Sequence, residues 1–277
     1  MGTARRWPAQ LQSSGGLLAG YPATWGGDER LAGRPAAGWP WGAKDADAAG
    51  GPWAVRRVPR DLIMLAACLA VFTVCAVIVA NGRVGPAERA VFHAINGLPG
   101  WLHQPMLYAQ YLGVLGVPLV FAAGALVWRR WRLAAALVLV VPLKLGLEQA
   151  AKLLVQRQRP GTTVPDAILR GVPHGGLSFT SGHAIITFAI AGLLVLVLPR
   201  RWGVLAIVLA ACNALARVYL GAHNPLDVVG GAAIGLAIAA VLDLVLDVAR
   251  DRGAARPDRA PRRGRIALPE RVSWGKS

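Results

Sequence analysis

The sequence predicts an all-α, polytopic membrane protein: six transmembrane helices in a bundle, a short interfacial helix, and disordered N- and C-terminal tails. Hydrophobic residues make up 55% of the 277-residue chain, which is too much apolar sequence for one soluble core. This sequence is gathered into six runs, most of them near the roughly 20 residues that a membrane-spanning helix needs. Charged residues lie mainly in the tails and in the short connections between the runs.

The chain divides into three parts on composition. Residues 1–55 are rich in Gly, Ala, Pro and Trp without helical or strand periodicity, which predicts a disordered tail. Residues 56–249 form the predicted membrane domain, and residues 250–277 form a basic, Pro-interrupted tail that we expect to be disordered and cytoplasmic. The predicted spans are residues 61–81, 104–128, 132–155, 184–199, 202–220 and 226–248.

The segment between the first two runs, Pro86 to Leu98 (PAERAVFHAINGL), has the pattern of an interfacial helix. Four apolar residues, Ala87, Val91, Ile95 and Leu98, share one helical face, and Glu88 and Arg89 lie on the opposite face.

Arginine placement predicts the orientation in the membrane. Arginines precede the first span, join the second to the third, and join the fourth to the fifth; these are Arg56, Arg57, Arg60, Arg129, Arg130, Arg132, Arg200 and Arg201. Because cytoplasmic loops carry an excess of basic residues, we expect both termini in the cytoplasm. The arginine-rich, Ala- and Gly-rich composition suggests a bacterial source, and therefore a bacterial cytoplasmic membrane.

The net charge of +16 does not indicate a nucleic-acid partner, because the basic residues form no single polar face. The anionic membrane surface or a phosphate-bearing substrate fits better. Cys68, Cys75 and Cys212 lie in apolar runs without a CxxC motif, so we expect neither a disulfide framework nor a metal site. No cofactor is expected, and the oligomeric state is left open.

Three short stretches place polar side chains at the ends of apolar runs: Lys152–Pro160 (KLLVQRQRP), Thr180–His183 (TSGH) and Arg217–Asp227 (RVYLGAHNPLD). Such groups are costly in a membrane and therefore indicate function. With the orientation above, all three stretches lie on the extracytoplasmic face. The arginines that set this orientation are different residues, so the convergence is an independent result.

The chemistry of these stretches suits a phosphate ester. Lys152, Arg159 and Arg217 offer cations to a tetrahedral oxyanion. Ser181 and Gly182 immediately precede a predicted helix, whose N-terminal N–H groups favour anions.

The third stretch also carries a candidate nucleophile. Asn224 and Pro225 suit a helix start, which leaves His223 four residues before Asp227. A carboxylate bonded to one imidazole nitrogen leaves the other free to attack, so His223 is the candidate nucleophile and Asp227 its orienting group. His183 is the candidate acid that protonates the leaving oxygen and then activates water.

The ordered motifs K-x6-R-P, SGH and R-x5-H-x3-D resemble the type 2 phosphatidic acid phosphatase superfamily of lipid phosphate phosphatases, over about residues 60 to 248. The resemblance implies a six-helix membrane bundle and a metal-independent reaction through a phosphohistidine at the extracytoplasmic face. It implies catalytic roles for His223, His183 and Asp227, and phosphate binding by Lys152, Arg159, Ser181, Gly182 and Arg217. Thr180 replaces a common proline and Ala216 a common serine, from which we expect altered rate or affinity.

The predicted function is hydrolysis of a lipid phosphate or diphosphate, with an isoprenoid diphosphate such as undecaprenyl diphosphate preferred over phosphatidic acid and phosphatidylglycerol phosphate. A phosphotransferase, a non-catalytic lipid-phosphate binder or transporter, and a vanadate haloperoxidase are the alternatives.

Two further pairs of side chains accompany the motifs. Lys144 and Glu148 have the spacing of a buried ion pair, which we interpret as structural. Arg157 and Arg170 flank the pocket, where contact with a second phosphate or lipid headgroup and surface anchoring are equally plausible.

Overall fold

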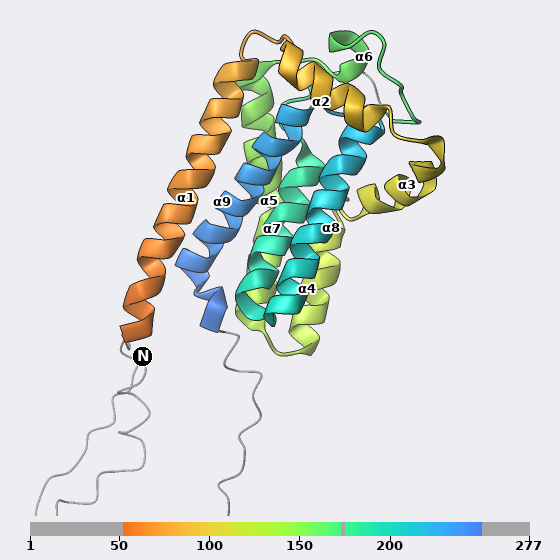
Figure 1. Cartoon of the computed structure of the whole chain (residues 1–277). Helices are drawn as coiled ribbons and strands as arrows, with labels where there is room; N and C mark the ends of the chain where they lie inside the picture. The colour runs from red at the N-terminus through yellow and green to blue at the C-terminus, as the bar shows by residue number, and fades with distance from the viewer. Residues whose placement is uncertain (1–51, 173–174, 251–277) are drawn as a thin grey trace, which may run out of the picture. The chain divides into compact units, whose positions relative to one another are not determined.

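The computed structural model describes residues 52–172 and 175–250, with side chains from residue 59 onward (Figure 1). Nearly all of the two predicted disordered tails therefore lies outside the described residues. Residues 52–55, which the sequence assigned to the N-terminal tail, are instead the first turn of α1 (Pro52–Val79). Arg250 likewise ends a short 3-10 helix, η3 (Val248–Arg250).

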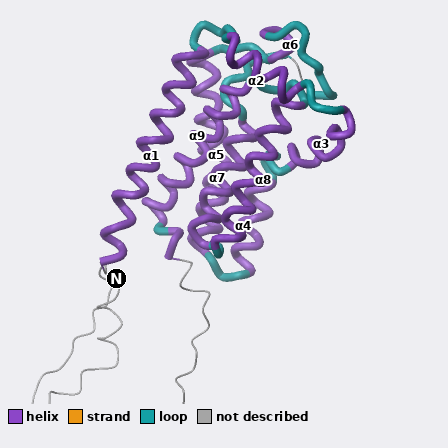
Figure 2. Tube along the Cα trace, in the orientation of Figure 1, coloured by secondary structure: helices purple, strands orange, loops and turns teal. Residues whose placement is uncertain are grey.

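The described residues form helices and connections, with no β-strand among them (Figure 2). After α1 the remaining helices are α2 (Pro86–Asn96), the 3-10 helix η2 (Gly100–Leu102), α3 (His103–Tyr111), α4 (Val117–Val127), α5 (Trp131–Val155), α6 (Pro160–Thr163), α7 (Gly182–Val197), α8 (Arg200–Tyr219) and α9 (Pro225–Leu246).

Four of these helices contain a segment long and apolar enough to cross a membrane: α1, α5, α8 and α9. Helices α4 and α7 are apolar but shorter, with 11 and 16 residues. At a rise of 1.5 Å per residue, α4 alone covers only about 16 Å. The prediction of a helical, multi-pass membrane protein is confirmed.

The predicted span at residues 104–128 is not one continuous helix. It divides into α3 and α4 at residues 112–116, where Gly113 and Gly116 weaken the helix. The break is also held from outside, because the Asn213 side chain donates to the carbonyls of Ala109 and Gln110 at 2.9 and 3.0 Å. An irregular backbone within an apolar run is tolerated where protein groups satisfy it in this way.

Helix α2 lies across one end of the bundle and packs against α8 and α9 (Figure 1), but the face that it turns inward differs from the predicted one. Phe92 and Asn96 are buried, and Glu88 points inward with a 7% exposed side chain. Val91, predicted on the apolar face, is 48% exposed. Besides Phe92, the inward face carries polar side chains because polar groups lie beneath it: the Asn96 side chain donates to the carbonyls of Ile168 and Tyr219.

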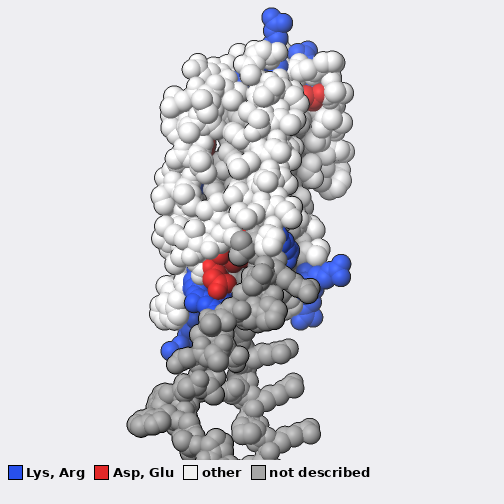
Figure 3. All heavy atoms as spheres, turned by 90° about the vertical axis from the view of Figure 1, so that its left-hand side faces the viewer, with Lys and Arg blue, Asp and Glu red and all other residues white. Residues whose placement is uncertain are grey.

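The core is apolar and lies between α4, α5, α7 and α9. Leu137, Ile185 and Leu193 are fully buried there, whereas Val77, Val120 and Leu154 on the outside are more than 69% exposed. A protein that exposes aliphatic side chains in this way is suited to a lipid environment rather than to water. Figure 3 shows where the charged residues lie: those visible are near the two ends of the bundle, with mostly uncharged atoms between them.

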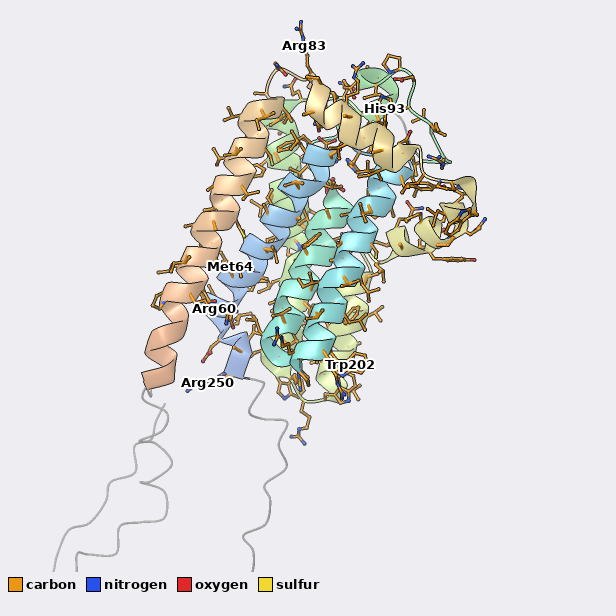
Figure 4. All side chains as sticks on the ribbon, viewed as in Figure 1. Arg60, Met64, Arg83, His93, Trp202 and Arg250 are labelled. Atoms are coloured by element: carbon orange, nitrogen blue, oxygen red, sulfur yellow. The ribbon has the colours of Figure 1, made fainter. Side chains whose placement is uncertain are left out.

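The two ends of the bundle carry different parts of the sequence. Arg60, Trp202 and Arg250 lie toward one end, and Arg83 and His93 lie at the other (Figure 4). The connections after α5, before α7 and between α8 and α9 meet at the end marked by Arg83 and His93 (Figure 1). All three polar stretches therefore lie together, as the sequence predicted.

Candidate active site

His223 lies in the connection between α8 and α9 with only 2% of its surface exposed. Helix α9 begins at Pro225 with Asn224 as its N-cap, as predicted from the sequence. The backbone N–H of Asn224 donates to Asp227 Oδ2 at 2.8 Å, which turns the carboxylate back toward the start of the helix. This local structure fixes the positions of His223 and Asp227 relative to each other.

The predicted direct hydrogen bond between these two residues is replaced by a bridge through Ser178. His223 Nδ1 lies 3.9 Å from Asp227 Oδ2, too far for a hydrogen bond. The hydroxyl of Ser178 donates to Asp227 Oδ2 at 2.5 Å and lies 3.2 Å from His223 Nδ1. Because its one proton goes to the carboxylate, the hydroxyl accepts from Nδ1–H, which leaves the lone pair on Nε2. Ser178 was not among the predicted site residues, although it lies just before the TSGH motif.

Arg157 is neither a surface anchor nor a ligand exposed to the pocket, contrary to both predictions. Its side chain is fully buried and forms a two-pronged ion pair with Glu88 at 2.6 and 3.0 Å. It also donates to Asp227 Oδ1 at 2.9 Å. Burial alone would lower the pKa of the Arg157 guanidinium, but the two carboxylates more than offset it and raise the pKa. Arg157 thus holds Asp227 from the side opposite Ser178.

Two of the predicted phosphate-binding cations lie beside His223. Arg159 donates to the carbonyl of Ala222 at 3.1 Å, and Arg217 donates to Gln110 Oε1 at 2.6 Å. Arg217 is 5% exposed, and its Nε has no hydrogen-bond partner among the described residues. Burial lowers the pKa of Arg159. These guanidinium groups are desolvated, so an anion placed between them would be held strongly.

His223 is neutral at physiological pH. Burial is the main cause that lowers its pKa from 6.5 to about 4, and the positive charges of Arg217 and Arg159 act in the same direction. Asp227 opposes this shift but does not cancel it. A buried, neutral imidazole with a defined tautomer meets the requirements of a nucleophile.

The TSGH stretch forms the start of α7, which begins at Gly182 with Ser181 as its N-cap. The Ser181 N–H donates to the carbonyl of Asp227 at 3.0 Å and so joins α7 to α9. His183 is half-buried and interacts electrostatically with Arg217 and His223. The structure therefore brings both histidines to one place.

The break between α3 and α4 contributes to the same place. A Cβ atom added to Gly113 would lie 2.6 Å from His183 Cβ, so only glycine allows this close approach. Gln110, on the same segment, holds Arg217. Neither residue was predicted to belong to the site, because the hydropathy of this apolar run is that of one uninterrupted helix.

Lys152 lies at the end of α5, where it pairs with Glu148 at 2.5 Å. The predicted pair between Lys144 and Glu148 is present at 2.6 Å. Arg170 donates to the carbonyl of Tyr219 and stacks 4.1 Å above its ring, so it is tied to the end of α8. Within the described residues no group of three or more His, Cys, Asp or Glu side chains is placed to hold a metal ion.

Comparison with known proteins identifies this arrangement. Residues 131–249 match the family model of the PAP2 superfamily. It is 32% identical over 141 residues to an undecaprenyl-diphosphatase of Sulfolobus acidocaldarius, covering 51% of this chain and 66% of that protein. It is 40% identical over 95 residues to a decaprenylphosphoryl-5-phosphoribose phosphatase of Mycobacterium tuberculosis, covering 34% of this chain and 50% of the relative. The chain thus spans less than two thirds of the length of these relatives.

A crystal structure of a PAP2-type phosphatidylglycerolphosphate phosphatase from Bacillus subtilis has the same fold. The two structures align with a TM-score of 0.54 over 65% of this chain and 94% of the other, at 23% sequence identity.

Proposed function

We propose that this protein is a membrane phosphatase that hydrolyses a lipid phosphate or diphosphate through a phosphohistidine on His223. The observation that carries the proposal is the buried, neutral His223, whose Nδ1–H is bonded to Ser178 and whose pKa is lowered in part by the positive charges of Arg217 and Arg159 nearby. This arrangement provides a nucleophile and a place for the anion that it attacks.

The reaction proceeds in two steps. His223 Nε2 attacks phosphorus, the bond from phosphorus to the lipid oxygen breaks, and His183 gives its proton to that oxygen. Water then attacks the phosphohistidine, His183 takes the proton back, and inorganic phosphate leaves His223 in its starting form. Lys152, Arg159, Ser181, Gly182 and Arg217 bind the phosphate oxygens, and Asp227 stabilises the positive charge on His223 through Ser178.

In the membrane, the proposed six spans are α1, the broken segment α3–α4, α5, α7, α8 and α9. The arginines of the α4–α5 and α7–α8 connections lie at the end opposite His223, so the positive-inside rule places them in the cytoplasm. Both termini are then cytoplasmic, and the site opens on the extracytoplasmic side of a bacterial cytoplasmic membrane. Four long helices and two shorter ones of suitable apolarity support this topology.

An isoprenoid diphosphate is the preferred substrate. Both relatives are named for lipids with a prenyl chain: one is an undecaprenyl-diphosphatase and the other a decaprenylphosphoryl-5-phosphoribose phosphatase. Phosphatidic acid and phosphatidylglycerol phosphate are the alternative substrates. A phosphotransferase of the same family would use the same phosphohistidine but pass the phosphoryl group to an acceptor other than water.

The test is phosphate release by the detergent-purified protein in EDTA, from undecaprenyl diphosphate and phosphatidic acid side by side. We expect release in the wild type and none in His223→Ala. His93→Ala is the matched control, because the His93 side chain is 39% exposed and pairs with the exposed Asp166. Release that persists in His223→Ala contradicts the proposed nucleophile, and lipid binding without release favours the binder or transporter. Loss of lipid phosphate without free phosphate favours the phosphotransferase.

A further inference from the structure

Glu148 carries a carboxylate into the proposed phosphate site. It lies on α5 with a 14% exposed side chain, and it accepts a salt bridge from a lysine on either side along the helix. Lys144 contacts Oε2 at 2.6 Å, and Lys152 contacts Oε1 at 2.5 Å. The two lysines therefore hold different oxygens of one carboxylate.

The same carboxylate lies against the start of α7. A Cβ added to Gly182 would overlap both Glu148 oxygens, so the carboxylate touches the backbone at the first residue of the helix. In the proposed function, the backbone at Gly182 and the Lys152 side chain both bind the phosphate oxygens of the substrate. Both are in contact with an anion of the chain itself, the Glu148 carboxylate.

From these contacts we propose that Glu148 is a specificity-determining residue that competes with phosphate for Lys152 and the start of α7. This inference rests on the proposed function, from which the position of the bound phosphate is taken. When phosphate binds, Lys152 moves from Glu148 to the phosphate, and Glu148 stays neutralised by Lys144. A carboxylate held by Lys152 alone would be left unpaired at that moment, at a much higher cost.

The consequence is weaker binding of every small phosphate anion at this site. Inorganic phosphate is the product and has no lipid chain to add binding energy, so it is the ligand most affected. A lipid substrate retains its membrane contacts and still enters. Glu148 therefore favours release of the product over its retention.

The experiment is calorimetric titration of inorganic phosphate into the full-length protein in detergent. Glu148→Gln keeps the size of the side chain against Gly182 but removes its charge. We expect it to bind phosphate about tenfold more tightly than the wild type, because one repulsive charge is lost and Lys152 is released. Asp166→Asn removes one charge from an exposed position, 69% accessible, and should leave the affinity unchanged. Affinity of Glu148→Gln within twofold of the wild type, or weaker, overturns the inference.

A second variant covers the case in which Glu148→Gln folds poorly because Lys144 loses its partner. Lys144→Met combined with Glu148→Gln removes the buried pair together and still releases Lys152, so tighter phosphate binding is again expected. Binding needs no turnover, which separates the two proposals. Tighter binding in the variants with no lipid hydrolysis in the wild type would contradict the proposed function alone; hydrolysis with unchanged phosphate affinity would contradict the role of Glu148 alone.

Discussion

Replacing Arg157 by methionine tests the buried charge network behind His223. Arg157 is fully buried and its guanidinium serves two carboxylates, those of Glu88 and Asp227, which are 7% and 0% exposed. Methionine fills much of the same space but leaves both carboxylates without their cation. One carboxylate then has to take up a proton or remain as an unpaired buried charge.

The structure sets the size of the effect. Removing one partner of a buried ion pair costs about 3–5 kcal/mol. With about 2–4 °C of unfolding midpoint per kcal/mol for a domain of this size, Arg157→Met should lower the midpoint by about 10 °C. Phosphate release should fall as well, since Asp227 Oδ1 loses its donor and Asp227 no longer fixes Ser178 and His223 in place.

The assay is thermal unfolding of the detergent-purified protein, followed by intrinsic fluorescence, with phosphate release measured below the transition. Arg89→Met is the matched control, because Arg89 neighbours Glu88 on α2 but is exposed. Glu88→Gln combined with Arg157→Met should cost less than the sum of the two single changes, as expected for residues in one network. A midpoint shift for Arg157→Met no larger than that for Arg89→Met would refute this account of the network.

Three further predictions concern the histidines. Gly113→Ala should abolish most phosphate release, because its Cβ would lie 2.6 Å from the Cβ of His183. Gly116→Ala should retain phosphate release, because its Cβ would have nothing within 4 Å. Equal rates of phosphate release for the two variants would contradict the close packing of Gly113 against His183. His223 should titrate near pH 4 by histidine NMR, so the free energy of unfolding should fall as the pH drops from 6.5 to about 4, where only the unfolded state gains the proton. In Ser178→Ala the Nδ1–H of His223 loses its acceptor, and we expect kcat to fall about tenfold or more with KM little changed; an unchanged kcat would argue against the serine bridge.

The sequence predicted the helical membrane class and the meeting of three motifs, because both depend on local signals. Long apolar runs report burial in a bilayer, and Asn224 and Pro225 mark the start of α9 wherever that helix packs. The break after α3 has no such signal, since Gly113 and Gly116 lie in a run whose hydropathy is that of a helix. Only the packing of His183 and the carbonyl contacts of Asn213 explain it.

The inward side of α2 and the partners of Asp227 were missed for a different reason. The periodicity of residues 86–98 assigns Glu88 to water because a single charge is assumed to need solvent. Its actual partner, Arg157, is 69 positions further along the chain. Such a pairing is set by tertiary structure, and one sequence without its relatives contains no record of it. The role of Ser178 was not predicted for a similar reason, because nothing in the sequence distinguishes this serine from other serines in loops.

The break at residues 112–116 allows the chemistry of the site and the room around the lipid headgroup to vary independently, which the three motifs alone do not. The motifs lie on α5, α7, α8 and α9 and set the chemistry, whereas Gln110 and Gly113 reach the same histidine and arginine from a segment that carries no motif. A change of length or residue in this segment would alter the room around the lipid headgroup and leave every motif intact. Proteins that share all three motifs can therefore diverge in substrate, and the segment between α3 and α4 is the place to compare them.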